Sequence, residues 1–267
     1  MQPSQIVQTL DPPTEAVIKR EDRTLVWRER RPDGTPTVVK LYRKRSGLSA
    51  LRARTLRFRS EREFRRLTHL RRWGVPCTEP LAWAQGHSRE HAFHEVLVMR
   101  EVPNAVELGE CLGSGAVDLD LLPLFRIVRQ MHESGFCHQA LYARNVLVDS
   151  QAPAGEEFFL ADVPRSWTFP RSTAGTPMAW WDLLDLVVEL EEVGVPLQYD
   201  WLDAYGLCPA GRTWWDAKRS GAIDPREKRI RLMRDGAARL RWGMAWGAVW
   251  RSRARPQELN SSGRSGS

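Results

Sequence analysis

The sequence predicts an α+β protein with a small, antiparallel-sheet first lobe and a larger, helical second lobe. In the first hundred residues, short β-branched and apolar runs alternate with turn residues, which is the pattern of an antiparallel sheet. From Leu119 onward, longer segments with apolar residues at helical spacing take over. Strands followed by helices favour an α+β chain over alternating βαβ units.

The first lobe is expected over residues 15–102, after an irregular tail at 1–14. A helix is predicted at 60–73, with Ser60 as its N-cap and Glu63 completing a capping box. Gly74 follows this segment and is expected to end the helix. The predicted strands are 16–19, 24–28, 37–42, 81–84 and 95–99.

The second lobe is expected over residues 103–252, followed by a polar, disordered tail at 253–267. Apolar residues at helical spacing predict helices, and short apolar runs predict two strands. The predicted helices are 121–134, 181–192 and a basic segment after Gly221, and the strands are 146–148 and 158–161.

The bulk composition fits a folded protein that remains in the cytoplasm. The chain has 267 residues, 42% of them hydrophobic, and 12 tryptophans, enough for a sizeable core. The four cysteines lack C-x-x-C spacing, so buried, reduced thiols are expected rather than a disulfide framework or a zinc site. Neither a secretory signal pattern nor a run of 18 apolar residues occurs in the sequence.

Residues 138–148 have the spacing of the catalytic loop of a protein-kinase-like phosphotransferase. In that loop a His is followed two residues later by an Asp that accepts the proton of the attacking hydroxyl, and then by an Asn that holds a metal ion. His138 and Asn145 stand at this spacing, but Ala140 occupies the Asp position. Because a methyl group cannot accept a proton, the loop is predicted without its usual base.

Lys40 and Glu63 stand where such a fold places an ion pair at the phosphates. Lys40 ends an apolar, β-branched strand, close to the V-A-I-K pattern of kinases. Glu63 lies 23 positions later on the basic helix and is favoured over Glu61 as its partner. The alternatives are a solvent-facing Lys40 and a surface ion pair of Glu63 with Arg59 or Arg66.

Two oxygen-bearing side chains complete the set. Asn145 precedes one short apolar strand, and Asp162 follows another, at the positions of the two metal-binding residues of kinases. The D-F-G triplet of kinases is replaced by Asp162-Val163-Pro164. Taken alone, Asn145 could instead cap a turn, and Asp162 could be an ordinary turn residue before Pro164. The joint order of these positions predicts that the ammonium of Lys40 and both oxygen side chains converge on one cleft between the lobes.

Longer blocks around these residues resemble the lipopolysaccharide core kinases, the heptose and Kdo kinases of Gram-negative bacteria. The resemblance covers residues 15–205, and its blocks are 23–27, 38–42, 60–76, 98–101, 131–138, 159–162 and 181–186. It implies a bilobal, protein-kinase-like fold, ATP and Mg²⁺ as cofactors, and a sugar hydroxyl of the lipopolysaccharide inner core as acceptor.

The resemblance also implies roles for single residues. Ala140 departs from the family, which has Asp at this position. The absence of a glycine-rich loop between Lys19 and Leu25 is not a departure, because the family often lacks one. The implied roles are His138 as a structural residue of the loop, Lys40, Glu63, Met99 and Glu101 at the nucleotide, and Asn145 and Asp162 at the metal.

Three functions remain open on the sequence. The leading one is a nucleotide-binding lipopolysaccharide-core-kinase-like protein that is impaired, or a pseudokinase, through Ala140. The second is an active sugar kinase that uses a non-standard base. The third is a basic module that binds a membrane surface or nucleic acid, although no nucleic-acid motif is found.

The charge of the chain bears on its partners. Net charge is +7, and residues 43–72 are strongly basic. Such a face suits a phosphorylated inner-core glycolipid and the anionic inner face of the inner membrane. Trp242, Trp246 and Trp250 recur at helical spacing and would either pack against the helical lobe or lie at the membrane.

Overall fold

The computed structural model describes residues 7, 10–44, 58–88, 92–115 and 119–219. The chain divides into two compact units, Met1–Thr213 and Trp214–Ser267, and the residues of the candidate site belong to the first. Within the described ranges, no helix has the length and apolar character needed to cross a membrane. The expected basic helix after Gly221, its tryptophans and the tail at 253–267 lie outside the described residues.

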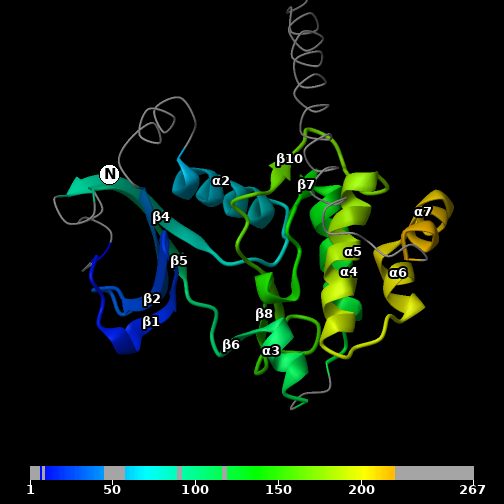
Figure 1. The fold of residues 1–267 in the computed structure, drawn as a ribbon, viewed down its shortest axis with the longest axis horizontal. Helices are drawn as coiled ribbons and strands as arrows, with labels where there is room; N and C mark the ends of the chain where they lie inside the picture. Colours follow the sequence, from blue (N-terminus) through cyan, green and yellow to red (C-terminus); the bar gives the residue numbers. More distant parts are fainter. Residues whose placement is uncertain (1–6, 8–9, 45–57, 89–91, 116–118, 220–267) are drawn as a thin grey trace, which may run out of the picture. The chain divides into compact units, whose positions relative to one another are not determined.

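A five-stranded antiparallel sheet forms the first part of the chain, in the order β1-β2-β3-β5-β4 (Figure 1). A short 3-10 helix, η2 (Thr14–Ala16), precedes it. The β2–β3 turn contains Gly34 with φ of +83°, a conformation that favours glycine. The strands are β1 (Val17–Arg20), β2 (Thr24–Arg30), β3 (Pro36–Lys44), β4 (Pro80–Ser88) and β5 (Ala92–Arg100).

The two faces of this sheet carry different residues because side chains alternate along a strand. One face contributes to a buried apolar cluster made of Leu25, Trp27, Val39, Leu41, Val96 and Val98, with Val7. On the other face, Lys40 pairs across the ladder with Val26 and Leu97. The strand register therefore turns Lys40 away from the apolar cluster.

Helix α2 (Arg59–Arg72) packs against β4 and β5, and it begins differently from the sequence prediction. The N-cap is Phe58, and Ser60 lies inside the helix, where its N–H and hydroxyl donate to Glu95 at 2.9 and 3.1 Å. Glu63 is directed to the sheet instead of back to the N-cap. The predicted capping box is therefore wrong, whereas the predicted end at Gly74, with φ of +70°, is confirmed.

The second part is mainly helical, as Figure 1 shows. A strand β6 (Ala105–Glu107) leads from the sheet into α3 (Leu108–Gly113). The longer helices are α4 (Leu122–Glu133) and α5 (Pro177–Glu192), followed by α6 (Tyr199–Tyr205) and α7 (Pro209–Arg219). The predicted α+β fold class is confirmed, but β6, α3, α6 and α7 were not predicted from the sequence.

Two small sheets frame the loop at residues 138–145. One has the order β6-β8-β9, with β8 (Val146–Asp149) and β9 (Phe158–Leu160) forming a hairpin. The other pairs β7 (Phe136–Cys137) with β10 (Trp167–Thr168). A 3-10 turn, η3 (Ala143–Asn145), ends the loop. All four cysteines are free; Cys208 is exposed and the other three are buried.

Candidate functional site

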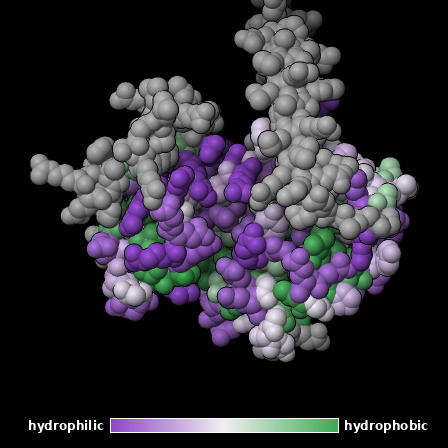
Figure 2. Space-filling model, viewed as in Figure 1, coloured by the Kyte–Doolittle hydropathy of each residue, from purple (hydrophilic) through white to green (hydrophobic). Residues whose placement is uncertain are grey.

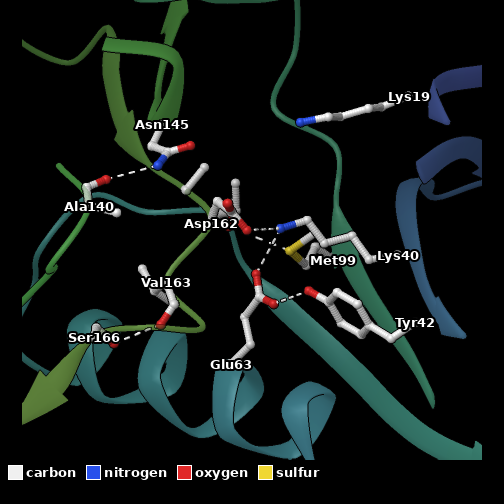
Figure 3. A network of polar contacts seen from close by, with 12 residues as sticks. Lys19, Lys40, Tyr42, Glu63, Met99, Ala140, Asn145, Asp162, Val163 and Ser166 are labelled. Carbon is white, nitrogen blue, oxygen red and sulfur yellow. Dashed lines mark hydrogen bonds and ion pairs between the residues drawn. The ribbon is translucent and has the colours of Figure 1, made fainter. Parts of the chain in front are cut away.

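The Lys40 ammonium is bound by Glu63 of α2. Nζ lies 2.8 Å from Oε1 of Glu63, a side chain with no exposed surface, and the Tyr42 hydroxyl donates to the other carboxylate oxygen (Figure 3). Burial alone would lower the pKa of Lys40, but the neighbouring acids, Glu63 first, raise it well above its usual value. The ammonium therefore stays charged. The alternative of a surface ion pair for Glu63 is wrong, and Glu61 pairs instead with Arg65.

Asp162 approaches the same ammonium from the other part of the chain. Its Oδ1 lies 2.8 Å from Lys40 Nζ, and 44% of its side chain is exposed. Although burial raises its pKa, the charge and hydrogen bond of Lys40 prevail and hold the pKa below the usual value. Its backbone has φ of +53°, which is uncommon for a residue other than glycine. The structure thus brings Lys40, Glu63 and Asp162 together.

The β8–β9 hairpin places Asn145 beside this group. Val146 pairs with Leu160, so Asn145 and Asp162 lie at the same end of the hairpin, and the Ala161 N–H donates to the Asn145 carbonyl at 2.9 Å. The side-chain nitrogen of Asn145 donates to the Ala140 carbonyl at 2.8 Å. The amide oxygen is then the atom left for a cation.

These two side chains fit a magnesium ion. Mg²⁺ is usually held by one or two protein oxygens together with substrate phosphates and water. Asp162 offers a half-exposed carboxylate and Asn145 an amide oxygen, and the two residues flank the same end of the β8–β9 hairpin. In the view of Figure 3, Asp162 lies between Asn145 and Lys40.

His138 supports the backbone that presents Asp162. The ring is fully buried, and Nε2 lies 3.0 Å from the Ala161 carbonyl. Burial lowers the pKa of His138, so the neutral ring donates its Nε2 proton to that carbonyl. The contact fixes the residue before Asp162.

Ala140 sits inside the loop, and the residue is 8% exposed. Its carbonyl accepts the Tyr142 N–H at 2.9 Å as well as the Asn145 amide. Asp149, the nearest following acid in the chain, is buried and accepts the Gln151 N–H at 3.0 Å. The loop thus keeps hydrogen bonds that shape it, while position 140 contributes no carboxylate.

The two other residues expected at the nucleotide differ in position. Met99 is buried in β5 and lies near Lys40 in Figure 3, where its sulfur accepts from the Thr78 hydroxyl. Glu101 directs its carboxylate to Arg28, at 2.6 Å from Nε, and its N–H to the Pro36 carbonyl. Its side chain is thus engaged by Arg28, not by the Lys40 group.

Asp182 of α5 is a site residue that the sequence analysis did not single out. Its buried carboxylate accepts the backbone N–H groups of His138 and Gln139 at 2.5 and 2.7 Å, and it faces His132 Nε2 at 3.3 Å. Gln139 has φ of +65°, so this acid holds the loop in an uncommon conformation. The presence of an acid in a mainly apolar helix was the sequence signal that could have pointed to Asp182.

Glu189 supports the far end of the loop in the same way. It lies seven residues after Asp182, on the same face of α5. One carboxylate oxygen accepts the Ala143 N–H at 2.7 Å, and the other lies 3.1 Å from an Arg144 nitrogen. Two acids of one helix therefore anchor both ends of the loop.

Comparison with known proteins identifies the family of this chain. The sequence model described as the lipopolysaccharide kinase (Kdo/WaaP) family matches residues 8–174. Among solved structures, the fold is similar to "WaaP in complex with acyl carrier protein", with a TM-score of 0.54 and 19% identity over 76% of this chain and 86% of that one. Among curated protein sequences, no relative matches. Because the family match spans more than half of the sequence, the chain belongs to the lipopolysaccharide kinase (Kdo/WaaP) family.

Proposed function

We propose that this protein binds ATP with Mg²⁺ between a first lobe ending near residue 102 and the helical second lobe, and that it is impaired in phosphate transfer. The observation that carries the proposal is the pairing of Lys40 with both Glu63 and Asp162, at 2.8 Å each. A charged lysine held by a buried acid, beside a metal-compatible carboxylate, suits the binding of a phosphate chain.

Each residue has a defined task in this proposal. Lys40, oriented by Glu63, binds phosphate oxygens, and Asn145 and Asp162 hold the metal. Mg²⁺, when bound, neutralises charge on the phosphates. His138 keeps the backbone at Ala161 in place, and Met99 lines the nucleotide side of the sheet.

The impairment follows from Ala140. A base in hydrogen-bond reach of the attacking hydroxyl contributes roughly 10²–10⁴-fold to rate, and a methyl group contributes none of it. The residues proposed for the nucleotide and the metal are retained in the chain, so binding is expected to persist where transfer is weak. The proposed acceptor is a sugar hydroxyl of the lipopolysaccharide inner core.

The basic surface of α2 is the proposed contact with the anionic glycolipid and with the inner face of the membrane. Arg65, Arg71 and Arg72 are exposed, and Figure 2 shows hydrophilic residues over the area where α2 lies. A positively charged face of this kind attracts anionic headgroups at low ionic strength. This supports a peripheral position at the membrane.

The test compares the wild type with Ala140→Asp. ATP binding in the presence of Mg²⁺ is measured by calorimetry, and phosphate transfer to purified lipid A–core is measured with labelled ATP. We expect binding by both proteins and a gain in transfer of about 10²-fold or more on restoring the acid. Ala140→Asp combined with Lys40→Met is the control and should remain inactive. Equal, robust transfer by wild type and Ala140→Asp would overturn the impairment.

A further inference from the structure

Lys19 of β1 and Lys40 of β3 project from the same face of the sheet. The β1–β2 ladder shifts register between Val17 and Lys19, so that Val17 pairs with Trp27 of the apolar cluster whereas Lys19 pairs with Val26. Val26 in turn pairs with Lys40. Lys19, Val26 and Lys40 thus form one row across three strands, and residues in such a row share a face.

The spacing of this row suits a chain of phosphates. Neighbouring strands lie about 4.8 Å apart, so two strand steps separate the backbones of the two lysines by roughly 10 Å. Figure 3 shows the Lys19 side chain extending toward the side of the site where Asn145 and Asp162 lie. Two ammonium groups can therefore approach one polyanion from different sides.

Lys19 and Asp162 both lie close enough to Glu107 to influence its charge. Burial raises the pKa of Glu107 at the end of β6, Glu110 adds to this, and Lys19 and Arg144 oppose it. Asp162 also acts on Glu107, so these charged groups occupy one region. This electrostatic relation agrees with the direction given by the strand register.

Lys19 forms a solvent-exposed ion pair with Glu21. Its Nζ lies 2.8 Å from Glu21 Oε1, but both side chains are 54% exposed. Such solvent-exposed ion pairs contribute little to stability. The ammonium is accordingly able to exchange this carboxylate for a phosphate.

The β1–β2 connection cannot supply the backbone contacts of a glycine-rich loop. Residues 20–24 contain no glycine, and the turn is closed by the Glu21 N–H donating to the Thr24 carbonyl at 2.8 Å. Glycine-rich loops hold phosphates through backbone N–H groups that lie open to the ligand. A side-chain cation is the remaining way for β1 to contribute.

We propose that Lys19 is a second phosphate-binding cation of this site and takes the place of the backbone amides of a glycine-rich loop. The inference rests on the proposed nucleotide binding and adds a residue to it. It predicts that Lys19 contributes to the binding of ATP and ADP but not of adenosine.

The test measures binding of ATP, ADP and adenosine by calorimetry with Mg²⁺ present, for wild type, Lys19→Ala and Arg20→Ala. Arg20 pairs with Leu25, so its side chain projects from the face of β1 opposite to that of Lys19. Arg20→Ala therefore removes one positive charge at the neighbouring residue but on the other face of the sheet. Lys19→Ala should weaken ATP binding about tenfold or more, as expected for loss of a charged hydrogen bond. Adenosine binding by Lys19→Ala, and ATP binding by Arg20→Ala, should stay within about twofold of wild type, well below that effect.

A further variant, Glu21→Gln, removes the competing carboxylate and should tighten ATP binding. Thermal melts check that each variant is folded. If Lys19→Ala bound ATP as tightly as the wild type does, the proposed role of Lys19 would be wrong, while the proposed nucleotide binding would stand. Absence of ATP binding by the wild type would overturn the proposed function and this inference with it.

Discussion

The Lys40 ammonium lies 2.8 Å from the Asp162 carboxylate, although 122 positions separate the two residues in the sequence. This contact joins the five-stranded sheet to the end of the β8–β9 hairpin. The same carboxylate is a proposed metal ligand, and the same ammonium is a proposed phosphate ligand. Binding of a metal–nucleotide complex would therefore replace this ion pair by contacts of each partner to the ligand.

The first prediction concerns the buried acid on the other side of Lys40. Lys40→Met leaves the fully buried Glu63 without its cation, and removal of one partner of a buried ion pair costs about 3–5 kcal/mol. The double variant Lys40→Met/Glu63→Gln should recover much of this loss, because the introduced glutamine amide is neutral and its oxygen can still accept from Tyr42. Urea denaturation measures both changes.

Lys19→Met is the matched control for this experiment, because it removes an exposed lysine from the same face of the sheet. Its effect on the free energy of unfolding should stay within about 0.5 kcal/mol. A double variant no more stable than Lys40→Met would contradict the view that an unpaired Glu63 causes the loss.

The second prediction is a pH dependence at Asp162. Its pKa is lowered in the folded protein, chiefly because Lys40 opposes the effect of burial. A group with a depressed folded pKa stabilises the protein above its unfolded pKa of about 3.9, and this contribution is lost as pH falls through the folded value. Asp162→Asn should thus be less stable than wild type at pH 7.

The difference between the two proteins should shrink as pH falls below about 4, because the carboxyl is then protonated in the unfolded chain but still ionised in the folded protein. Denaturation curves at a series of pH values measure it. Because the side chain is 44% exposed, solvent screening keeps the effect small. A difference that is constant from neutral to acidic pH would rule out this assignment.

The sequence predicted the site better than it predicted the local structure around it. The order of Lys40, Glu63 and Asp162 along the chain was enough to expect the ion pairs that join them in the structure. The capping box failed because Glu63 reaches Lys40 and Tyr42, and Ser60 reaches Glu95 35 positions away. Local spacing carries no information on such distant partners.

Asp182 was missed for the same reason. Its partners, the backbone N–H groups of His138 and Gln139, lie 44 and 43 positions earlier and involve no side-chain pattern. The short strands β6, β7 and β10 were also missed, since segments of two or three residues are too short to show a period.

The third prediction concerns Arg66 of α2. Its Nη1 donates to the backbone carbonyls of Val163 and Pro164 at 3.3 and 2.5 Å, directly after Asp162. Burial lowers its pKa to about 10, so the guanidinium remains charged at neutral pH. Arg66→Ala should loosen the turn that holds Asp162 at positive φ and weaken Mg²⁺-dependent ATP binding more than adenosine binding.

Arg65→Ala is the control for Arg66, because Arg65 is exposed and pairs within the helix with Glu61. Calorimetric titration of ATP, with and without Mg²⁺, separates the two variants. An equal loss of ATP and adenosine binding in Arg66→Ala would point to general unfolding. Unchanged ATP binding in that variant would exclude a positioning role.

The last prediction tests the support of the loop by α5. Asp182→Asn replaces a carboxylate that accepts two backbone N–H groups by an amide with only one accepting atom. One N–H of the pair at His138 and Gln139 is left unsatisfied, which costs about 1–3 kcal/mol. Amide hydrogen exchange should therefore speed up at residues 138 and 139 beyond the global loss of stability.

Glu133→Gln serves as its control, because Glu133 is half exposed and its carboxylate pairs with Arg129 within α4. That variant should leave exchange at residues 138 and 139 unchanged. If Asp182→Asn altered exchange evenly over the whole chain, the acid would stabilise the core without shaping the loop. A selective change at the loop, joined to weaker metal-dependent nucleotide binding, connects α5 to the site through His138 and the Ala161 carbonyl.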